Sequence, residues 1–275
     1  MLGTDVLRTL DAQGIARTAV DRGDLELVDE GAVGEAVVAH DVVVNCAAWT
    51  AVDDAETHEP EAYEINAVAP GVLARAAAQH GRRMVHVSTD YVFDGTSRSP
   101  YDEDEPPDPR SAYGRTKATG ESAVRAAASG NHLVVRTAWL YGAHGACFPR
   151  TIARLARERG AVSVVDDQFG QPTWTLDVAE LIVRLVEAHA PAGTWHATSA
   201  GETSWFGFAR RVVEAAGLSP EIVTATDSLS FVRPAPRPAY SVLGHDKLHA
   251  LGIEPIGAWE ERWQQAASEV LGLEK

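Results

Sequence analysis

The chain has 275 residues, and its 24 Lys and Arg against 39 Asp and Glu give a formal net charge of −15. A composition of 45% apolar and 23% charged residues is ordinary for a globular protein and excludes extended disorder. An acidic chain without a basic stripe is a poor ligand for nucleic acid, and no apolar run approaches the roughly 18 residues that a membrane span needs.

The first residues and the cysteines favour a cytoplasmic location. The opening MLGTDVLRTLDAQG lacks the basic and then apolar layout of a secretory signal. The two cysteines, Cys46 and Cys147, cannot build a disulfide framework, and nothing around them resembles a zinc site. We therefore expect no bound metal and no membrane or nucleic-acid partner.

Short apolar runs alternate with helical stretches through the first half of the chain. The β-branched run 41–45 is as brief as a strand buried on both faces should be, and an alanine-rich helix from about 66 to 80 follows it, closed by Gly81. Strand, helix and strand continue at 84–88, 113–128 and 132–136. This spacing predicts an α/β fold with a doubly wound parallel sheet.

Two proline-rich segments interrupt the alternation. Residues 99–109 form a predicted loop, whose acidic run 102–105 we expect to be a solvated surface segment rather than a metal site. The second cluster, 233–238, lies in the C-terminal third, where the strict alternation ends. We expect a small cap there, over the carboxyl ends of the strands, where ligands bind in α/β folds.

The first chemically informative spacing is Tyr113-Gly-Arg-Thr-Lys117. Residues four apart on a helix lie one turn apart on the same face, so an ammonium would neighbour the phenol. A free phenol has a pKa near 10, and a nearby positive charge lowers it, which would make Tyr113 a workable proton donor. Alone, this spacing is more often explained by an aromatic residue and a lysine on a helix surface.

Two predicted strand ends give the pair a context. The strand at 84–88 runs into Thr89, whose hydroxyl could donate to a substrate carbonyl oxygen beside the tyrosine. The strand at 41–45 runs into Cys46-Ala-Ala-Trp-Thr50, where small residues would let a cofactor approach the backbone. Because the carboxyl ends of parallel strands meet at one edge of the sheet, we expect these groups to converge on one crevice.

Six segments in this order resemble the extended short-chain dehydrogenase/reductases of the Rossmann fold. More narrowly, they resemble the dTDP-4-dehydrorhamnose reductase family of deoxysugar biosynthesis. The segments are Asn45-Cys-Ala-Ala-Trp-Thr-Ala-Val-Asp53, Ser88-Thr-Asp-Tyr-Val-Phe-Asp-Gly95, Tyr113–Lys117, Arg136-Thr-Ala-Trp-Leu-Tyr-Gly142, Asp167-Gln-Phe-Gly-Gln-Pro-Thr173 and Arg237-Pro-Ala-Tyr-Ser241. The likeness covers nearly the whole chain.

The resemblance implies a reaction and a role for individual residues. The family reduces the C4 ketone of a dTDP-4-keto-6-deoxyhexose with NADPH or NADH, most characteristically forming dTDP-L-rhamnose. Thr89, Tyr113 and Lys117 would be catalytic, with Tyr113 giving its proton to the C4 oxygen. The implied cofactor contacts are Gly3, Asp24, Leu25, Ala48, Trp49, Thr50, Tyr113 and Lys117, those at 24 and 25 resting on a gapped alignment. The implied substrate contacts are Thr89, Asp90, Trp139 and Arg237, the arginine holding the diphosphate.

The chain departs from the family pattern at its start. The family opens with a strand and a glycine-rich turn, of which Gly3 fits the third glycine, followed by a helix from about 4 to 10. The first strand and first two glycines are thus missing, which a misplaced start or a truncated chain explains better than a natural loss. We expect an NAD(P)-binding domain at 1–147. Residues 148–275 would be mostly the cap, with segments near 161–198 returning to the sheet.

Several alternatives stay open at this point. After a predicted second strand stand both Asp21, a residue type that favours NAD, and Arg22, which tolerates NADP, so the sequence does not choose between the cofactors. Another sugar-nucleotide reductase or an epimerase of the same fold, as in dihydrostreptose or antibiotic sugar pathways, is one rival. Dehydratases of this fold have the motif Thr-Asp-Glu at the catalytic strand end, where this chain has Thr89-Asp90-Tyr91. Tyr91 in place of the glutamate favours reduction over dehydration. A non-catalytic regulatory subunit, like the partner of a methionine adenosyltransferase, is the other rival. A monomer or a homodimer is expected.

Overall fold

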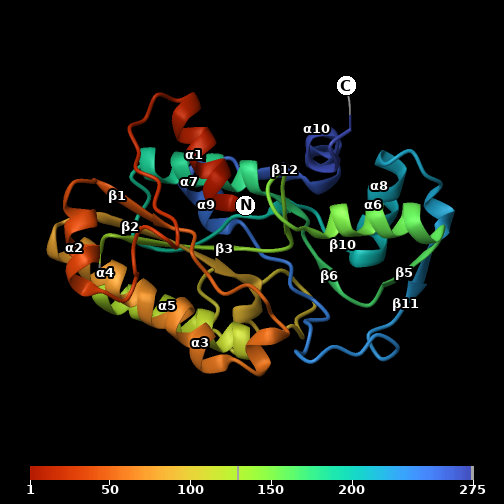
Figure 1. Cartoon of the computed structure of the whole chain (residues 1–275), viewed down its shortest axis with the longest axis horizontal. Coiled ribbons are helices and arrows are strands. Elements are labelled where there is room, and N and C mark those ends of the chain that lie inside the picture. The colour runs from red at the N-terminus through yellow and green to blue at the C-terminus, as the bar shows by residue number, and fades with distance from the viewer. Residues whose placement is uncertain (129, 274–275) are drawn as a thin grey trace.

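A four-stranded parallel sheet forms the centre of the computed structural model, which describes residues 1–128 and 130–273. Its order is β1-β2-β3-β8, from β1 (Val42–Asn45) through β2 (Arg83–Thr89) and β3 (His132–Thr137) to β8 (Gly193–His196). The three strands predicted in the first half are confirmed, and β8 adds a later segment of the chain to the same sheet (Figure 1).

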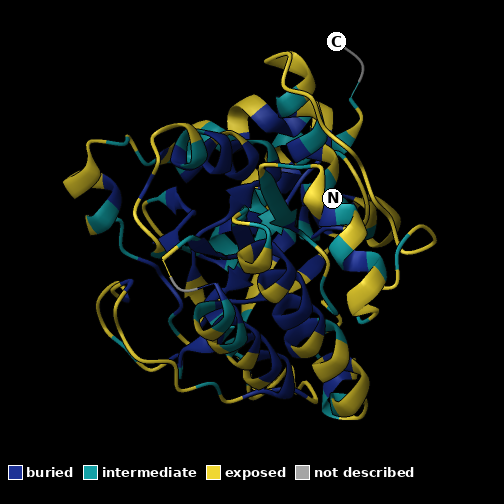
Figure 2. Cartoon of the chain, turned by 90° about the vertical axis from the view of Figure 1, so that its left-hand side faces the viewer, coloured by how far each residue is buried: buried dark blue, intermediate teal, exposed yellow. Residues whose placement is uncertain are grey.

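Helices cover both faces of this sheet, as the doubly wound prediction requires. On one face α1 (Leu2–Ala12) packs against α7 (Thr175–Glu187), and their apolar side chains meet those of β2 and β3. On the other face lie α2 (Glu30–Val38), α4 (Ala69–Gln79) and α5 (Ala112–Ala127). Figure 2 shows the inner helix faces buried and the outer helix faces exposed.

Two expectations for the first half are wrong in detail. The helix expected from 66 begins at Ala69, because a wider π turn, η2 (Glu64–Val68), follows α3 (Glu59–Tyr63) and precedes it. No strand forms before Asp21: described residues 13–29 are loop and turn, and β1 is the edge of the sheet. A strand is stabilised by pairing with a neighbour, and these residues have no described strand beside them.

The predicted loop at 99–109 is present, but its acidic run is not wholly solvated. Glu103 is only 3% exposed, and its carboxylate accepts a hydrogen bond from the backbone N–H of Lys247 at 3.3 Å. The neighbouring Asp104 pairs with the Lys247 ammonium at 2.5 Å. One face of the loop therefore packs against the C-terminal part of the chain, and the expectation of a fully solvated run is wrong for Glu103.

The C-terminal half builds a second apolar cluster beside the sheet. It is formed chiefly by α6 (Phe148–Arg159), α8 (Trp205–Ala215) and α10 (Trp259–Leu271). Two-stranded pairs join its segments: β4 (Leu140–Tyr141) with β7 (Thr173–Trp174), β5 (Val162–Val165) with β11 (Val223–Thr226), β6 (Phe169–Gly170) with β10 (Thr203–Ser204), and β9 (Ser199–Ala200) with β12 (Ile256–Ala258). The short helices are η1 (Asp54–Glu56), η3 (Asp90–Val92), η4 (Pro220–Ile222) and α9 (Asp246–Leu251). None of the described helices is long and apolar enough to cross a membrane.

Candidate active site

Helix α5 brings Tyr113 and Lys117 onto its buried face. Ser111 caps the helix by accepting the Gly114 N–H at 3.0 Å, which fixes where the first turn begins. Gly114 lies so close to β2's end that a Cβ there would sit 2.2 Å from the carbonyl oxygen of Tyr91. This close approach leaves Tyr113 8% and Lys117 2% exposed, so the pair is not a surface aromatic and lysine.

Thr89 and Asp90 close the strand end opposite the tyrosine. The Thr89 hydroxyl donates to the Asp90 carboxylate at 2.8 Å and accepts the Tyr91 N–H at 3.3 Å. Burial raises the pKa of Asp90 to about 6, although the nearby Ser241 hydroxyl and the hydrogen bond from Thr89 act in the opposite direction. A carboxyl and a hydroxyl are thus held together at the carboxyl end of β2.

The phenol of Tyr113 remains protonated in this environment. Burial raises its pKa to about 12, and the Asp90 charge adds to the rise while the neighbouring Thr89 hydroxyl opposes it. The expectation that Lys117 lowers this pKa is therefore wrong, because loss of contact with water dominates. A phenol in this state can donate a proton but is not a base at neutral pH. The ring of Tyr91 packs edge-on against Tyr113, with 5.5 Å between centroids.

The hydrogen-bond contacts of Lys117 are with residues of β2 rather than with Tyr113. Its Nζ donates to the Val87 carbonyl oxygen at 2.7 Å and lies 3.5 Å from His86 Nε2. Burial lowers its pKa to about 8, while the charges of Glu121 and Cys46 act upward. The ammonium therefore exchanges its proton closer to neutral pH than an exposed lysine does.

The segment after β1 lies beside this pair because Asn66 fixes its backbone. The Asn66 side chain accepts the Trp49 N–H at 2.9 Å, donates to the Trp49 carbonyl oxygen at 3.1 Å and reaches the Thr116 hydroxyl at 3.0 Å. Trp49 then packs with Tyr113 in one apolar cluster, flanked in sequence by Ala48 and the exposed Thr50. Asn66 was not predicted, although a lone amide in an apolar stretch before a proline is a usable signal.

The N-terminus of α1 reaches the same strand end. A Cβ built on Gly3 would lie 3.7 Å from Cys46, the residue that follows β1. The first turn of α1 has no side-chain cap, so the backbone N–H groups of Leu2 and Gly3 are available to an anion. The buried Trp49 Nε1 has no hydrogen-bond partner among the described residues. These unpaired donors fit a bound dinucleotide.

Asp24 and Leu25 lie apart from this cluster. Asp24 is exposed, and its carboxylate accepts the backbone N–H of Asp21 at 2.8 Å. Leu25 packs against the apolar cluster of α2 and α4, which includes Val33 and Val37. The structure thus groups the other expected cofactor residues at the strand ends, while Asp24 lies on an exposed loop and Leu25 packs against α2 and α4.

Trp139 is held in a strained conformation on the other side of the site. Its φ of 47° is rare for a bulky residue, and its ring stacks on Trp205 with centroids 3.5 Å apart. A Cβ on Gly170 would come within 2.5 Å of the Trp139 ring, so only glycine leaves room for it. The two indoles and Phe148 form a partly exposed aromatic platform.

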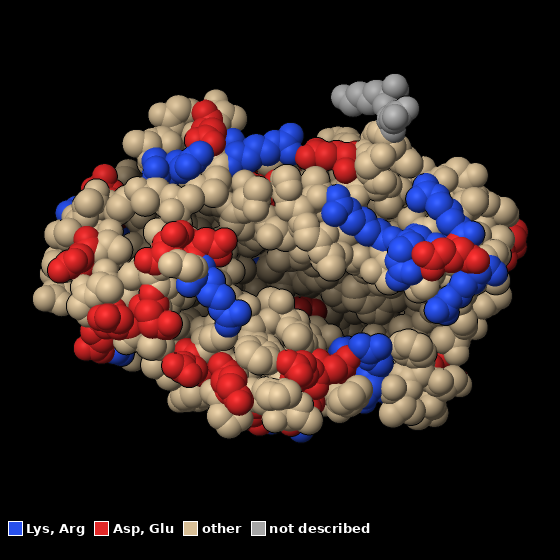
Figure 3. Space-filling view, viewed as in Figure 1, with Lys and Arg blue, Asp and Glu red and all other residues tan. Residues whose placement is uncertain are grey.

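Arg237 lies on a loop that crosses from the C-terminal half to the segment after β1. Its guanidinium pairs with Asp53 at 2.9 Å, and Arg233 contacts the other oxygen of the same carboxylate. A small cleft beside it is lined by Arg237, Tyr91 and Ser111. Figure 3 shows a hollow between the two halves of the molecule, with Lys and Arg gathered towards its right-hand side.

A parallel Rossmann-type sheet whose crossover helix carries a buried Tyr and Lys one turn apart defines the class of short-chain dehydrogenase/reductases. The sequence profile of the RmlD substrate binding domain matches residues 1–271. The chain belongs to this family.

Individual relatives extend the likeness over almost the full length. The chain is 46% identical to a dTDP-4-dehydrorhamnose reductase of Streptomyces griseus, covering 94% of this chain and 87% of the relative. It is 45% identical to a probable dTDP-4,6-dihydroxy-2-methyloxan-3-one 4-ketoreductase of Streptomyces antibioticus, covering 100% and 94%. A crystal structure of dTDP-4-dehydrorhamnose reductase from Bacillus anthracis in complex with NADP superposes with a TM-score of 0.91, at 33% identity and 96% and 94% coverage.

Proposed function

We propose that this protein reduces the C4 ketone of a dTDP-4-keto-6-deoxyhexose with NADPH or NADH, with dTDP-4-dehydro-L-rhamnose as the leading substrate. The observation that carries the proposal is the burial of Tyr113 and Lys117 beside Thr89, at the end of a parallel sheet. The relatives' names support it, since each describes a reductase acting on a dTDP-linked sugar.

Each residue at the strand ends has a task in this reaction. The protonated phenol of Tyr113 gives its proton to the C4 oxygen, and the Thr89 hydroxyl donates a hydrogen bond to the same oxygen as negative charge develops there. Lys117, one turn after Tyr113 on the buried face of α5, supplies positive charge to the site. Asp90 and Trp139 contact the sugar, and the guanidinium of Arg237 binds the diphosphate.

The cofactor is bound by backbone donors and small residues. Gly3 and the uncapped turn of α1 receive the pyrophosphate, and Ala48, Trp49 and Thr50 line the adenosine side. Lys117 and Tyr113 face the nicotinamide riboside, while Asp24 and Leu25 reach the adenine end. When bound, the reduced nicotinamide supplies the hydride that goes to C4.

A specific residue separates reduction from the related elimination. Tyr91 lies edge-on to Tyr113, at the position where the related dehydratases have a glutamate. Burial raises the pKa of the Tyr91 phenol. The second carboxyl group that elimination requires is replaced here by a neutral aromatic ring. This favours reduction over dehydration.

The remaining expectations rest on the sequence. We propose a cofactor domain at 1–147 and a cap within 148–275, a division supported by the separate apolar cluster of α6, α8 and α10. We also propose a cytoplasmic monomer or homodimer.

The direct test is oxidation of NADH and of NADPH by the chain in the presence of enzymatically generated dTDP-4-dehydro-L-rhamnose. Turnover with formation of dTDP-L-rhamnose supports the proposal. Turnover only with another dTDP-4-keto sugar moves the substrate within the family. No turnover with any of them, together with a stoichiometric protein partner in a pull-down, supports the regulatory-subunit alternative.

A further inference from the structure

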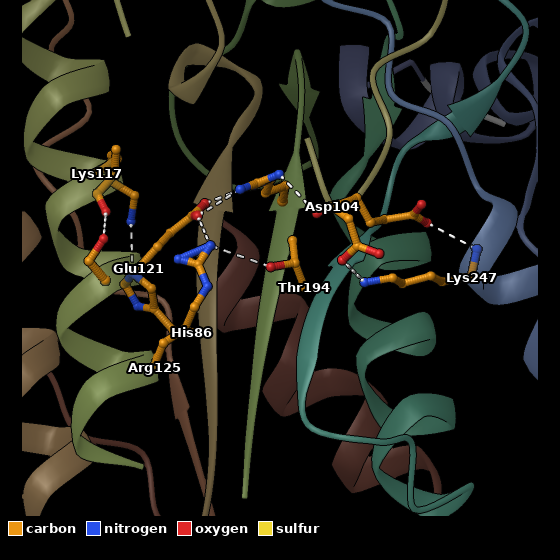
Figure 4. Close-up of polar contacts among 11 residues, drawn as sticks. His86, Asp104, Lys117, Glu121, Arg125, Thr194 and Lys247 are labelled. Carbon is orange, nitrogen blue, oxygen red and sulfur yellow. Dashed lines mark hydrogen bonds and ion pairs between the residues drawn. The ribbon is translucent and has the colours of Figure 1, made fainter. Parts of the chain in front are cut away.

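His86 is a fully buried histidine that the proposed reaction does not use. It lies on β2 and points towards α5, where Figure 4 shows it beside Lys117, with Glu121 and Arg125 further along the same helix. Its Nε2 lies 3.5 Å from Lys117 Nζ, and its Nδ1 lies 3.2 Å from Nδ2 of Asn45, the last residue of β1. The imidazole thus connects the end of β1 with the buried lysine.

The hydrogen bonds of Asn45 determine which ring nitrogen carries the proton. Asn45 Oδ1 accepts the backbone N–H of Ala47 at 3.0 Å, so its NH₂ group faces the ring. A neutral imidazole has one donor and one acceptor, so Nδ1 must accept and Nε2 must carry the hydrogen. Burial and the charges of Lys117 and Arg125 lower the pKa of His86 well below its usual value, which keeps the ring neutral.

This tautomer turns an N–H towards Lys117 rather than a lone pair. The Lys117 ammonium donates to the Val87 carbonyl oxygen, but it finds no acceptor at His86 Nε2. Two donors facing each other disfavour the charged form of the lysine. The other titratable groups that face it are Glu121 on α5, which favours its charge, and Cys46 after β1, whose thiol has its pKa raised to about 11 by burial.

We propose that Asn45 and His86 are positioning residues for Lys117. Asn45 fixes the His86 ring so that its Nε2–H faces the lysine. This N–H directs the remaining N–H bonds of Lys117 away from β2 and makes the Lys117 ammonium release its proton more easily. The effect on turnover rests on the role of Lys117 in the proposed reductase. The tautomer itself does not depend on any substrate.

The tautomer is tested by nitrogen NMR on the full chain labelled with ¹⁵N-histidine. The His86→Gln variant identifies the His86 signals by their loss. We expect a neutral ring protonated at Nε2 throughout pH 6 to 9, and in Asn45→Asp a ring protonated at Nδ1, because a carboxylate there can only accept. A native ring that is protonated at Nδ1, or that titrates near its ordinary pKa, overturns the proposal.

The consequence for Lys117 is tested by the pH dependence of kcat. Reduction needs the protonated site, so loss of that proton gives the alkaline limb. Asn45→Asp turns the Nε2 lone pair towards Lys117 and should move this limb up by about one pH unit, roughly a tenfold change in proton affinity. His86→Gln keeps an N–H near the lysine and should leave the limb near its native position.

The double variant Asn45→Asp, His86→Gln separates the ring from the added charge. If the ring transmits the effect, the double variant loses most of the shift; if it keeps the full shift, the carboxylate acts directly and the proposal fails. An unshifted limb in Asn45→Asp also overturns it. If the native chain shows no turnover, the proposed function fails, and the NMR experiment still decides the tautomer.

Discussion

Tyr113 and Lys117 keep 8% and 2% of their surface exposed, whereas the side chains of Arg233 and Arg237 keep 46% and 18%. The catalytic end of the site is held by the buried hydrogen bond from Lys117 to the Val87 carbonyl oxygen of β2 and by close packing of α5. The arginine end is held by ion pairs with one partly exposed carboxylate, that of Asp53. Buried contacts fix a geometry in advance, while exposed ion pairs are weak and can be exchanged for a ligand. We therefore expect the chemistry to be preorganised and the diphosphate contacts to form on binding.

The largest effect is expected for Tyr113→Phe, which removes only the proton donor. General acid catalysis contributes roughly 100- to 10,000-fold, so kcat should fall within that range. The buried ring position is kept, so the affinity for NADPH, followed by quenching of tryptophan fluorescence, should change less than about threefold. Comparable losses of turnover and cofactor affinity would contradict the proton-donor role.

Asp90→Asn tests the cost of preorganisation at the catalytic end. Burial raises the pKa of Asp90 in the folded protein to about 6, from an ordinary value near 4, so folding favours the protonated carboxyl. Stability from this group is fully present below pH 4 and is lost as pH rises through 6. The variant should therefore gain about 3 kcal/mol in free energy of unfolding relative to the native chain between pH 4 and pH 8.

Urea unfolding at pH 4 and pH 8 measures this free energy. Asp94→Asn is the matched control, since its change in free energy of unfolding should have the opposite sign. Hydrogen bonds from Thr96 and Tyr101 lower the pKa of Asp94, so its ionised form stabilises the fold. This stability is present above the ordinary pKa and is lost as pH falls below it. The Asp94 variant should thus lose stability at neutral pH, and equal responses of the two variants would be inconsistent with the assigned burial of Asp90.

Gly114→Ala tests the close approach of α5 to β2. The new methyl would meet the Tyr91 carbonyl oxygen, and overpacking of this kind costs about 1–3 kcal/mol. Gly34→Ala in α2 is the control, since nothing lies within 4 Å of its position, and there alanine should stabilise the helix by roughly 0.5–1 kcal/mol. Thermal unfolding of both variants measures the difference, and equal effects would mean that α5 can shift without cost.

The sequence predicted what depends on local spacing. The strands, the helix that carries Tyr113 and Lys117, and the shared face of that pair all follow from periodicity within a few residues. Asn66, which reaches Trp49 17 residues away, and Asp53, which reaches Arg233 180 residues away, could not be inferred in this way. The raised pKa of Tyr113 also depends on how deeply the helix is buried, which spacing alone does not determine.

The smallest effect, and the one that sharpens the comparison most, is expected for Asp53→Asn. The asparagine oxygen can still accept the hydrogen bond from the Ala235 N–H. It lacks the negative charge that pairs with Arg237 and Arg233 in the free protein. Partly exposed ion pairs contribute about 0.2–1 kcal/mol, so dTDP should bind up to about fivefold more tightly, with kcat unchanged within twofold.

Arg237→Gln should act in the opposite direction, because it removes a charge-assisted hydrogen bond to phosphate worth about 1.5–3 kcal/mol and so weakens dTDP binding roughly 10- to 150-fold. Calorimetric titration with dTDP measures both variants. If Asp53→Asn instead weakens binding as Arg237→Gln does, the carboxylate positions the arginine for the diphosphate rather than competing with it. The arginine end would then be preorganised in the same sense as the catalytic end, and the contrast between the two regions would be one of exposure alone.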